Sequence, residues 1–307
     1  MNNSSSFNGI SYLKGYTRID ENFVKELDGA FEARLASAVA EWGSNSSVRV
    51  IGLTGPTCSG KTTAAKKLIR HLGDAERRVC TVSLDDFFKD QFSRQQLDGM
   101  DPTKLDFDSP DTLDVELLSD FTDRLFSCGV AEKPIFDFVK GERNGIERVE
   151  LDDDDVLLLE GIQVLYPAVL STIEAHGGAV LCVRPESGIE VDGVRFEPNL
   201  IRLFRRLVRD RNFRGASPEF TMGLWGSVRK NEDQNIFPYI DRCHTRIDTT
   251  LAYELNILAP YLRRYLREMS PSDRYYADGM RYLEMINNIE GIGSDVIAPH
   301  SLYREFV

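Results

Sequence analysis

The sequence predicts an α/β fold, a mainly parallel sheet flanked by helices, on three observations. The apolar run "VRVIGL" at Val48–Leu53 is rich in β-branched residues, as buried parallel strands are. A glycine-bearing loop, "GPTCSGKTT" at Gly55–Thr63, follows at once, and apolar residues at helical spacing fill Thr62–Leu72. Later apolar runs again alternate with helical patterns, which is typical of parallel strands joined by helices. Ligands of such folds bind at the carboxyl ends of the strands.

The chain ahead of this first strand, residues 1–47, is expected to be an extension of the main domain. Residues 1–19 are rich in Ser, Asn and Gly, a composition typical of a flexible segment. Glu21–Trp42 has apolar residues at helical spacing and predicts a helix that packs against the core or a partner subunit. Residues 48–307 are expected to form the functional domain, with helices at its C-terminal end.

Beyond the first helix the alternation continues. Strands are expected at 77–84, 154–162 and 177–184, and a helix at about 113–127. The acidic run 152–155, just before one of these strands, predicts a solvated turn rather than a metal site. No internal repeat is found, so the alternation describes a single sheet wrapped by helices.

Composition narrows the classes of function. A formal net charge of −12 and a pI near 4.9 argue against nucleic acid as a partner, because such binding needs a basic face. The five cysteines form no C-x-x-C pair, which is typical of reduced thiols in a cytoplasmic protein. The longest apolar stretch, starting at Val156, is interrupted by Glu160 and is too short to span a bilayer, and no signal peptide opens the chain. We therefore expect a soluble, cytoplasmic protein without a membrane partner.

The loop at Gly55–Thr63 predicts a polyphosphate site. It matches the pattern G-x-x-x-x-G-K-[ST] and stands between a strand and a helix, as that pattern requires. Backbone N–H groups and the helix N-terminus would surround the phosphates, Lys61 would add a positive charge, and the Thr62 hydroxyl would be a ligand for Mg²⁺. The residues expected to bind the nucleotide are Gly55, Pro56, Thr57, Cys58, Ser59, Gly60, Lys61, Thr62 and Thr63.

Acidic residues at two other strand ends point to phosphoryl transfer rather than simple nucleotide binding. "SLDDFF" places Asp85 and Asp86 at the end of the second strand, where one carboxylate can take the proton of an acceptor hydroxyl. Neighbouring side chains point in different directions, so only one of the two is expected to be the base. In "LLLEGI" a third strand brings Glu160 to the same edge, as a ligand for Mg²⁺.

A cationic helix completes the predicted site. Within Asn199–Gly215, the side chains of Arg202, Arg206 and Arg209 fall on one helical face. Arginines beside a glycine-bearing loop suit a lid, here expected at about 199–235, that neutralises the transferring phosphate and excludes water.

Together these motifs resemble the uridine kinase family, within the wider phosphoribulokinase/uridine kinase group of P-loop kinases, and its bacterial-type branch in particular. Further matching segments run from residue 48 to "SLYREF" near the C-terminus; they are "FDSPDTLD", "KPIFDF", "RRLVRDRNFRG", "SVRKNEDQNIFPY" and "AYELNIL". The resemblance implies a P-loop NTPase-type fold, ATP as the phosphate donor and Mg²⁺ as the cofactor.

The resemblance also implies catalytic roles by position. Asp85 would be the general base on a ribose 5′-hydroxyl, with Lys61 holding the donor phosphates. Arg209 and Arg214 would be lid arginines on those phosphates. Glu160 would serve Mg²⁺.

For the acceptor, the resemblance implies that Asp108 and Arg206 hold ribose hydroxyls. Phe136 and Phe138 would flank the base of the acceptor, a use to which aromatic faces are suited. Family members that accept pyrimidine ribonucleosides commonly carry a His shortly after this aromatic segment, and Gly141 is found there instead.

The sequence thus favours an ATP-dependent kinase for a nucleoside-like small molecule, uridine or cytidine by resemblance, and leaves room for a homo-oligomer. A kinase for a sugar phosphate such as ribulose 5-phosphate, or for another small alcohol, would keep the mechanism and need a second anion site, for which Lys140 and Arg143 are candidates. An alternative of another class is a nucleotide-binding regulatory protein without turnover.

Overall fold

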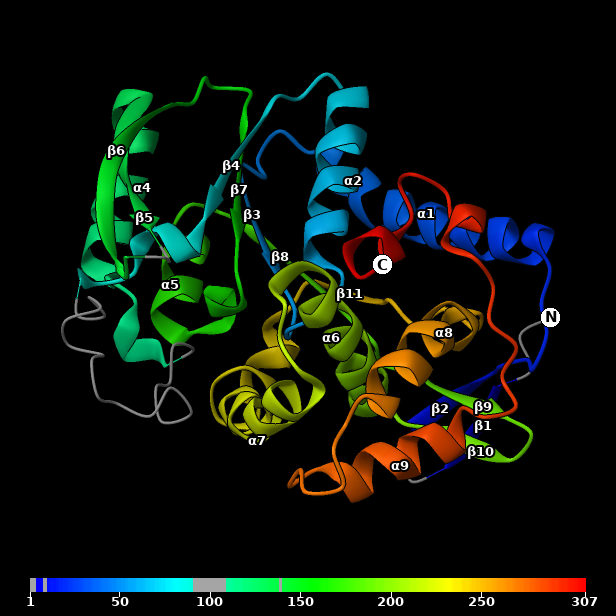
Figure 1. Cartoon of the computed structure of the whole chain (residues 1–307). Coiled ribbons are helices and arrows are strands. Elements are labelled where there is room, and N and C mark those ends of the chain that lie inside the picture. Colours follow the sequence, from blue (N-terminus) through cyan, green and yellow to red (C-terminus); the bar gives the residue numbers. More distant parts are fainter. Residues whose placement is uncertain (1–3, 8–9, 91–108, 138–139) are drawn as a thin grey trace.

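The computed structural model describes residues 4–7, 10–90, 109–137 and 140–307, with side chains from residue 10 onward. Its central sheet has five parallel strands in the order β11-β8-β3-β7-β4 (Figure 1). The strands are β3 Val50–Thr54, β4 Val79–Ser83, β7 Val156–Glu160, β8 Ala179–Arg184 and β11 Thr245–Asp248. The predicted α/β class with a parallel sheet is confirmed.

Helices cover both faces of this sheet. One face carries α1 Glu21–Ser44 and α2 Lys61–Asp74, and the other carries α4 Val115–Cys128 and α5 Pro167–Ala175. The pleat of β7 divides its side chains between them, because Leu158 packs on the α1–α2 side whereas its neighbour Leu159 packs on the α4–α5 side. Burial on both faces explains why the strands read as continuous apolar runs.

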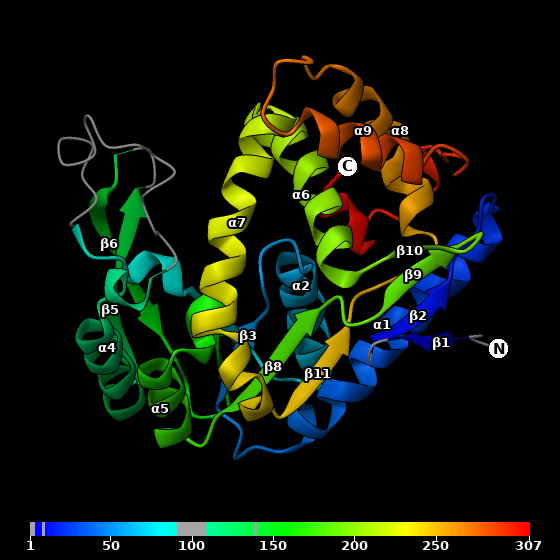
Figure 2. The same cartoon turned by 90° about the horizontal axis from the view of Figure 1, so that it is seen from below.

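A helical layer extends from the carboxyl edge of the sheet, as Figure 2 shows for α6 and α7. Its helices are α6 Pro198–Arg214, α7 Pro218–Asn235, α8 Glu254–Arg267 and α9 Tyr276–Met285. Gly215 ends α6 in the left-handed conformation, with φ of 66°. Since α6 and α7 pack side by side, their side chains are held above the strand ends where ligands bind in such folds.

Short elements complete the described structure. Two small sheets are formed by β5 Val130–Asp137 with β6 Glu142–Glu150, and by β1 Ser4–Phe7, β2 Ile10–Lys14, β9 Gly188–Val191 and β10 Val194–Phe196. The 3-10 helices are η1 Leu84–Phe87, η4 Pro110–Thr112, η5 Ile162–Leu165, η6 Phe237–Arg242, η7 Ser294–Val296 and η8 Leu302–Glu305. Of these, η1 and η5 directly follow the strand ends that carry Asp85 and Glu160.

The N-terminal segment contains strands where its composition suggested flexibility. β2 pairs in parallel with β9, and Tyr12 on β2 is only 1% exposed. The expected helix is present as α1, and its apolar side chains pack on α2. The Ser-rich strand β1 lacks the apolar alternation that identifies a strand, and β2 pairs with β9, which is far away in the sequence.

The acidic run before β7 is a turn, as expected, but one of its side chains is buried. Asp155 is 5% exposed, accepts a 2.7 Å hydrogen bond from the backbone N–H of Asp152 and pairs with Arg78. The described ranges contain no helix long and apolar enough to cross a membrane.

Candidate active site

The loop between β3 and α2 has the backbone of an anion-binding loop. Cys58 and Gly60 adopt positive φ angles of 57° and 95°, and helical residues begin at Lys61. Alternating right- and left-handed residues turn successive N–H groups toward one side, where they can surround a phosphate. At Gly60 a side chain is excluded twice, by the positive φ and by Leu302, with which an added Cβ would collide.

The carbonyl groups of this loop are held from the outside. Arg202 Nε donates to the Thr57 carbonyl at 3.1 Å and Arg205 Nη1 to the Cys58 carbonyl at 3.2 Å. Both guanidinium groups are buried and ion-paired, Arg202 with Glu232 and Arg205 with Glu254. Arg202, expected to face the phosphates with the other arginines, therefore supports the loop from behind.

A cavity of about 360 Å³ opens at this loop. It is lined by P-loop residues and by acidic and basic residues from η1, β7 and α6, which are far apart in the sequence. The candidate residues that line it are Thr57, Cys58, Lys61, Thr62, Asp85, Glu160, Arg206, Arg209 and Arg214. The structure thus brings four of the nine predicted nucleotide-binding residues to one cavity with the predicted base, metal ligands and lid arginines.

The two adjacent aspartates of η1 have different surroundings. Asp85 lines the cavity and accepts a 2.8 Å hydrogen bond from Nε2 of Gln163. Asp86 instead accepts a 2.7 Å ionic hydrogen bond from Lys133 on β5. Asp85 is thereby available for chemistry, whereas Asp86 ties the β5–β6 hairpin to the sheet edge.

Two of the acidic groups that line the cavity, Asp85 and Glu160, have raised pKa values. Burial raises the pKa of Asp85, while the Gln163 hydrogen bond and the Lys61 ammonium act in the opposite direction. Burial also raises the pKa of Glu160, against the lowering effect of Lys61. A carboxylate with a raised pKa is suited to accept a proton near the operating pH.

The buried carboxylate of Asp210 lies close to the three arginines that line the cavity. Asp210 is 4% exposed and lies 3.2 Å from Arg206 Nε, 2.8 Å from Arg209 Nη2 and 3.6 Å from Arg214 Nη1. Three guanidinium groups around one carboxylate leave an excess of positive charge at the cavity wall, which suits the phosphate groups of a nucleotide.

The oxygen-bearing residues fit a magnesium ion carried by a nucleotide. Glu160 supplies a carboxylate and Thr62 a hydroxyl on the same cavity, and Mg²⁺ prefers oxygen ligands completed by phosphates and water. Over the residues that the structure describes, no group of three or more His, Cys, Asp and Glu side chains could hold a metal without such help.

The structure describes only some of the residues that were predicted to bind the acceptor. Asp108 and Phe138 lie outside the described residues. Phe136 is on β5, 9% exposed, with its ring edge-on to Phe88 at 5.5 Å, and it is not among the residues that line the cavity. Gly141 has φ of 71° in the turn between β5 and β6, so the missing histidine coincides with a position where the backbone favours glycine.

Four acidic or amide residues near the site were not foreseen, namely Gln163, Asp210, Glu232 and Glu305. Glu232 accepts a 3.3 Å hydrogen bond from the Thr57 N–H, and Glu305 accepts from both the N–H and the hydroxyl of Thr63, at 3.3 Å and 3.4 Å. Three of these residues lie inside motifs of the resemblance, Asp210 in "RRLVRDRNFRG", Glu232 in "SVRKNEDQNIFPY" and Glu305 in "SLYREF". Their partners come from other elements, so a single motif does not indicate their role.

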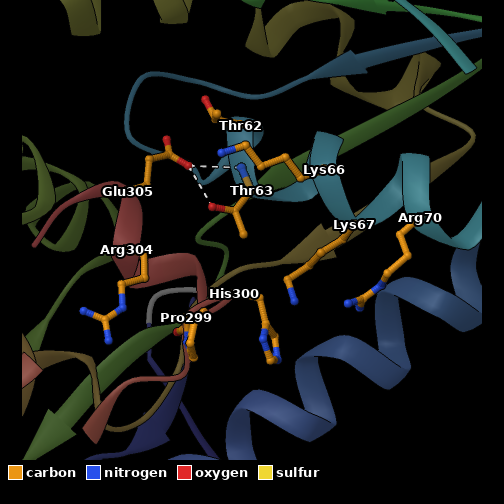
Figure 3. Close-up of a pocket in the computed structure, with 10 residues that line it drawn as sticks. Thr62, Thr63, Lys66, Lys67, Arg70, Pro299, His300, Arg304 and Glu305 are labelled. Atoms are coloured by element: carbon orange, nitrogen blue, oxygen red, sulfur yellow. Dashed lines mark hydrogen bonds between the residues drawn. The ribbon is translucent and has the colours of Figure 1, made fainter. Parts of the chain in front are cut away.

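Glu305 belongs to a second, smaller pocket beside the loop. Figure 3 shows it between α2 and the C-terminal segment, with Lys66 and Arg70 on the helix side and Arg304 opposite. The pocket measures about 180 Å³. The carboxylate of Glu305 points at Thr63, in the first turn of α2, where phosphate oxygens bind in loops of this kind.

Comparison with known proteins agrees with the motifs. The model of the family described as "Phosphoribulokinase / Uridine kinase family" matches residues 50–253. A uridine kinase of Clostridium botulinum (strain Langeland) is 33% identical over 180 residues, which are 58% of this chain and 77% of the relative. A uridine kinase of Geobacillus sp. (strain WCH70) is 29% identical over 179 residues, 58% of this chain and 75% of that protein. The structure of phosphoribulokinase from Rhodobacter spheroides superimposes with a TM-score of 0.46 at 13% identity, covering 80% and 99% of the two chains.

Proposed function

This chain belongs to the phosphoribulokinase/uridine kinase family and is therefore an ATP-dependent kinase with a small alcohol as acceptor; from that premise we propose that the alcohol is the 5′-hydroxyl of a ribonucleoside, uridine or cytidine. The observation that carries the proposal is the single cavity that joins Lys61 and Thr62 of the P-loop to Asp85 and the α6 arginines. Phosphoryl transfer requires groups that bind the donor phosphates, a base for the acceptor hydroxyl, and positive charges that stabilise the transferring group.

In the proposed reaction the protein mainly positions the two substrates and neutralises the charge of the transferring phosphoryl group. Loop N–H groups and Lys61 hold the donor phosphates, and the arginines held by Asp210 balance the charge that spreads over the transferring group. Asp85 orients the acceptor hydroxyl and takes its proton as the new O–P bond forms and ADP leaves. Thr62 and Glu160 would hold Mg²⁺, which would supply positive charge beside the donor phosphates.

The sugar-phosphate alternative lacks support on the acceptor side. Arg143 Nη2 lies 2.8 Å from Asp114, and its Nε donates to the Phe88 carbonyl at 3.0 Å. Lys140, the other candidate, lies 3.9 Å from the carboxylate of Asp137. A second phosphate would have to compete with these partners, which favours an uncharged acceptor.

The proposal is tested by following ADP release with Mg²⁺·ATP and a panel of ribonucleosides, deoxynucleosides and sugar phosphates. We expect turnover with uridine or cytidine. Asp85→Asn should lower kcat by about 10²–10⁴-fold because the proton acceptor is lost. Asp86→Asn is the matched control, since it removes a neighbouring carboxylate that ties down β5, and it should cost stability more than turnover.

Other outcomes reject specific parts of the proposal. Turnover confined to a purine nucleoside or a sugar phosphate would leave the kinase chemistry and overturn the acceptor. ATP binding without turnover on any acceptor would favour the regulatory alternative. Equal losses in Asp85→Asn and Asp86→Asn would remove Asp85 from its role as the base.

A further inference from the structure

Gln163 is a buried amide in the apolar layer beneath the active site. It lies on η5, is 1% exposed, and has Val164 and Leu165 of the apolar core as its neighbours along the chain. Its Nε2 donates to Oδ1 of Asp85 at 2.8 Å. Its Oε1 accepts no hydrogen bond within the described part of the chain.

An apolar side chain would be the simpler solution at this position. A buried amide oxygen without a partner costs free energy, whereas leucine or methionine would fill similar space without leaving a polar atom unsatisfied. The amide is explained by its NH₂ group, which donates to Asp85. A carboxylate oxygen can only accept a hydrogen bond, so it pairs with Nε2 of the amide and not with Oε1. Gly161 leaves room for this amide, because an added Cβ at Gly161 would collide with Oε1 of Gln163.

We propose that Gln163 is a positioning residue that holds Oδ1 of Asp85 and so turns Oδ2 toward the acceptor hydroxyl. This inference rests on the proposed role of Asp85 as the base. Oδ2 accepts no hydrogen bond from the residues described and lies on a side chain that lines the cavity, so it is the oxygen left for the acceptor's proton. When the hydroxyl oxygen attacks the γ-phosphorus, its proton passes to Oδ2 and the bond to ADP breaks.

The hydrogen bond also favours the ionised form of the base. The charged groups that face Asp85 are Lys61 from α2, Glu160 from β7 and the adjacent Asp86, with the α6 arginines across the cavity. Burial raises the pKa of Asp85 and the Gln163 amide counteracts it. Loss of the amide should therefore raise the pKa of Asp85 and move the acid limb of the kcat profile to higher pH.

Gln163→Met is the direct test, because it conserves volume and removes the donor. We expect kcat with the nucleoside acceptor to fall by about tenfold or more, as for loss of a hydrogen bond to a charged group. The KM for ATP should not change. Val164→Ala on the same short helix is the control for lost packing, and it should leave kcat and the pH profile as in the wild type.

Gln163→Glu provides a second variant of the same size. It sets two carboxylates against each other, which should move the acid limb in the same direction and further. Unchanged kcat and an unchanged acid limb in both variants would overturn the inference. So would equal changes in Val164→Ala, because they would reduce Gln163 to a packing residue.

A readout without turnover separates this inference from the proposed function. The pKa of Asp85 can be followed by ¹³C NMR of its carboxyl carbon, assigned by its disappearance in Asp85→Asn. If no acceptor is phosphorylated, the proposed function fails, and a higher pKa of Asp85 in Gln163→Met would still support the contact. An unchanged pKa would overturn the inference whatever the acceptor.

Discussion

At the scale of single residues, the site holds acidic groups whose ionised forms are unfavourable without a ligand. Glu160 shows this most clearly, because burial raises its pKa and Asp85 and Glu305 add like charge, opposed only by Lys61. Such groups are retained at a cost in stability, which is typical of functional positions. Glu160 could be predicted from its strand end, but its burial depends on elements that fold over it.

Glu160→Gln should therefore stabilise the protein without ligands. A raised folded-state pKa means that the protonated form favours folding, and this contribution is lost as the pH rises through that pKa. At neutral pH the neutral amide should raise Tm by about 2 °C or more, and the gain should fall as the pH is lowered through the raised pKa of Glu160. Thermal melts of both proteins across this pH range measure the effect.

An equal or lower Tm for Glu160→Gln at neutral pH would contradict this electrostatic description. The same variant should lose the response of its turnover to Mg²⁺, which is a separate readout of the proposed metal role. Gln163 and Asp210 were not predicted, because the sequence around an amide or a carboxylate does not show which side chain it contacts.

At the scale of elements, α6 has two functions that its sequence does not separate. Its arginines at 206, 209 and 214 line the cavity, whereas Arg202 and Arg205 hold the P-loop carbonyls from behind. The helical spacing predicted a cationic face but not this division, which depends on the acidic partners Glu232 and Glu254 on other helices. The helix is thus part of the loop's support as well as a candidate lid.

Glu254→Gln tests the supporting function. Arg205 and Glu254 are both fully buried, so removal of the carboxylate leaves an unpaired guanidinium in the interior. We expect the free energy of unfolding to fall by about 3–5 kcal/mol. Glu268→Gln, which breaks the exposed pair with Arg211, is the control and should cost about 1 kcal/mol or less.

Chemical denaturation of the two variants gives both values. ATP affinity should also fall in Glu254→Gln, since Arg205 donates to the carbonyl of Cys58 in the loop. Similar stabilities of the two variants would show that the buried pair does not support the fold.

The C-terminal helix η8 is a second element placed against the loop. Glu305 accepts from the N–H of Thr63, a group expected to bind phosphate. Glu305→Gln should therefore strengthen ATP binding several-fold, because a negative charge beside the phosphates is removed. Glu290→Gln, an exposed acidic residue earlier in the C-terminal region, controls for net charge and should leave the affinity unchanged.

Calorimetric titration with ATP compares the three proteins. Weaker binding in Glu305→Gln would contradict competition and would indicate that the carboxylate contacts the nucleotide favourably. "SLYREF" marked this segment as part of the resemblance, but its position against α2 depends on contacts between residues more than 200 positions apart, such as that of Glu305 with Thr63.

At the scale of the whole molecule, the fold was largely predictable and the surroundings of the site were not. The parallel strands and their helices follow from apolar runs and helical spacing, which are local signals. The β2–β9 pairing and the contact of Asp85 with Gln163 join distant segments and leave no local pattern. Asp85 and Glu160 nevertheless share one cavity with Lys61 and Thr62 of the P-loop, because the carboxyl ends of parallel strands meet at one edge.

The central claim is the transfer of the γ-phosphoryl group of ATP to a ribonucleoside 5′-hydroxyl in this cavity. The most direct measurement is ³¹P NMR, with mass spectrometry, of the product formed from uridine and Mg²⁺·ATP, beside a reaction with 5′-deoxyuridine. The account predicts a 5′-monophosphate from uridine, little product with Asp85→Asn and none from 5′-deoxyuridine. A phosphorylated 5′-deoxyuridine, or unchanged product with Asp85→Asn, would contradict it.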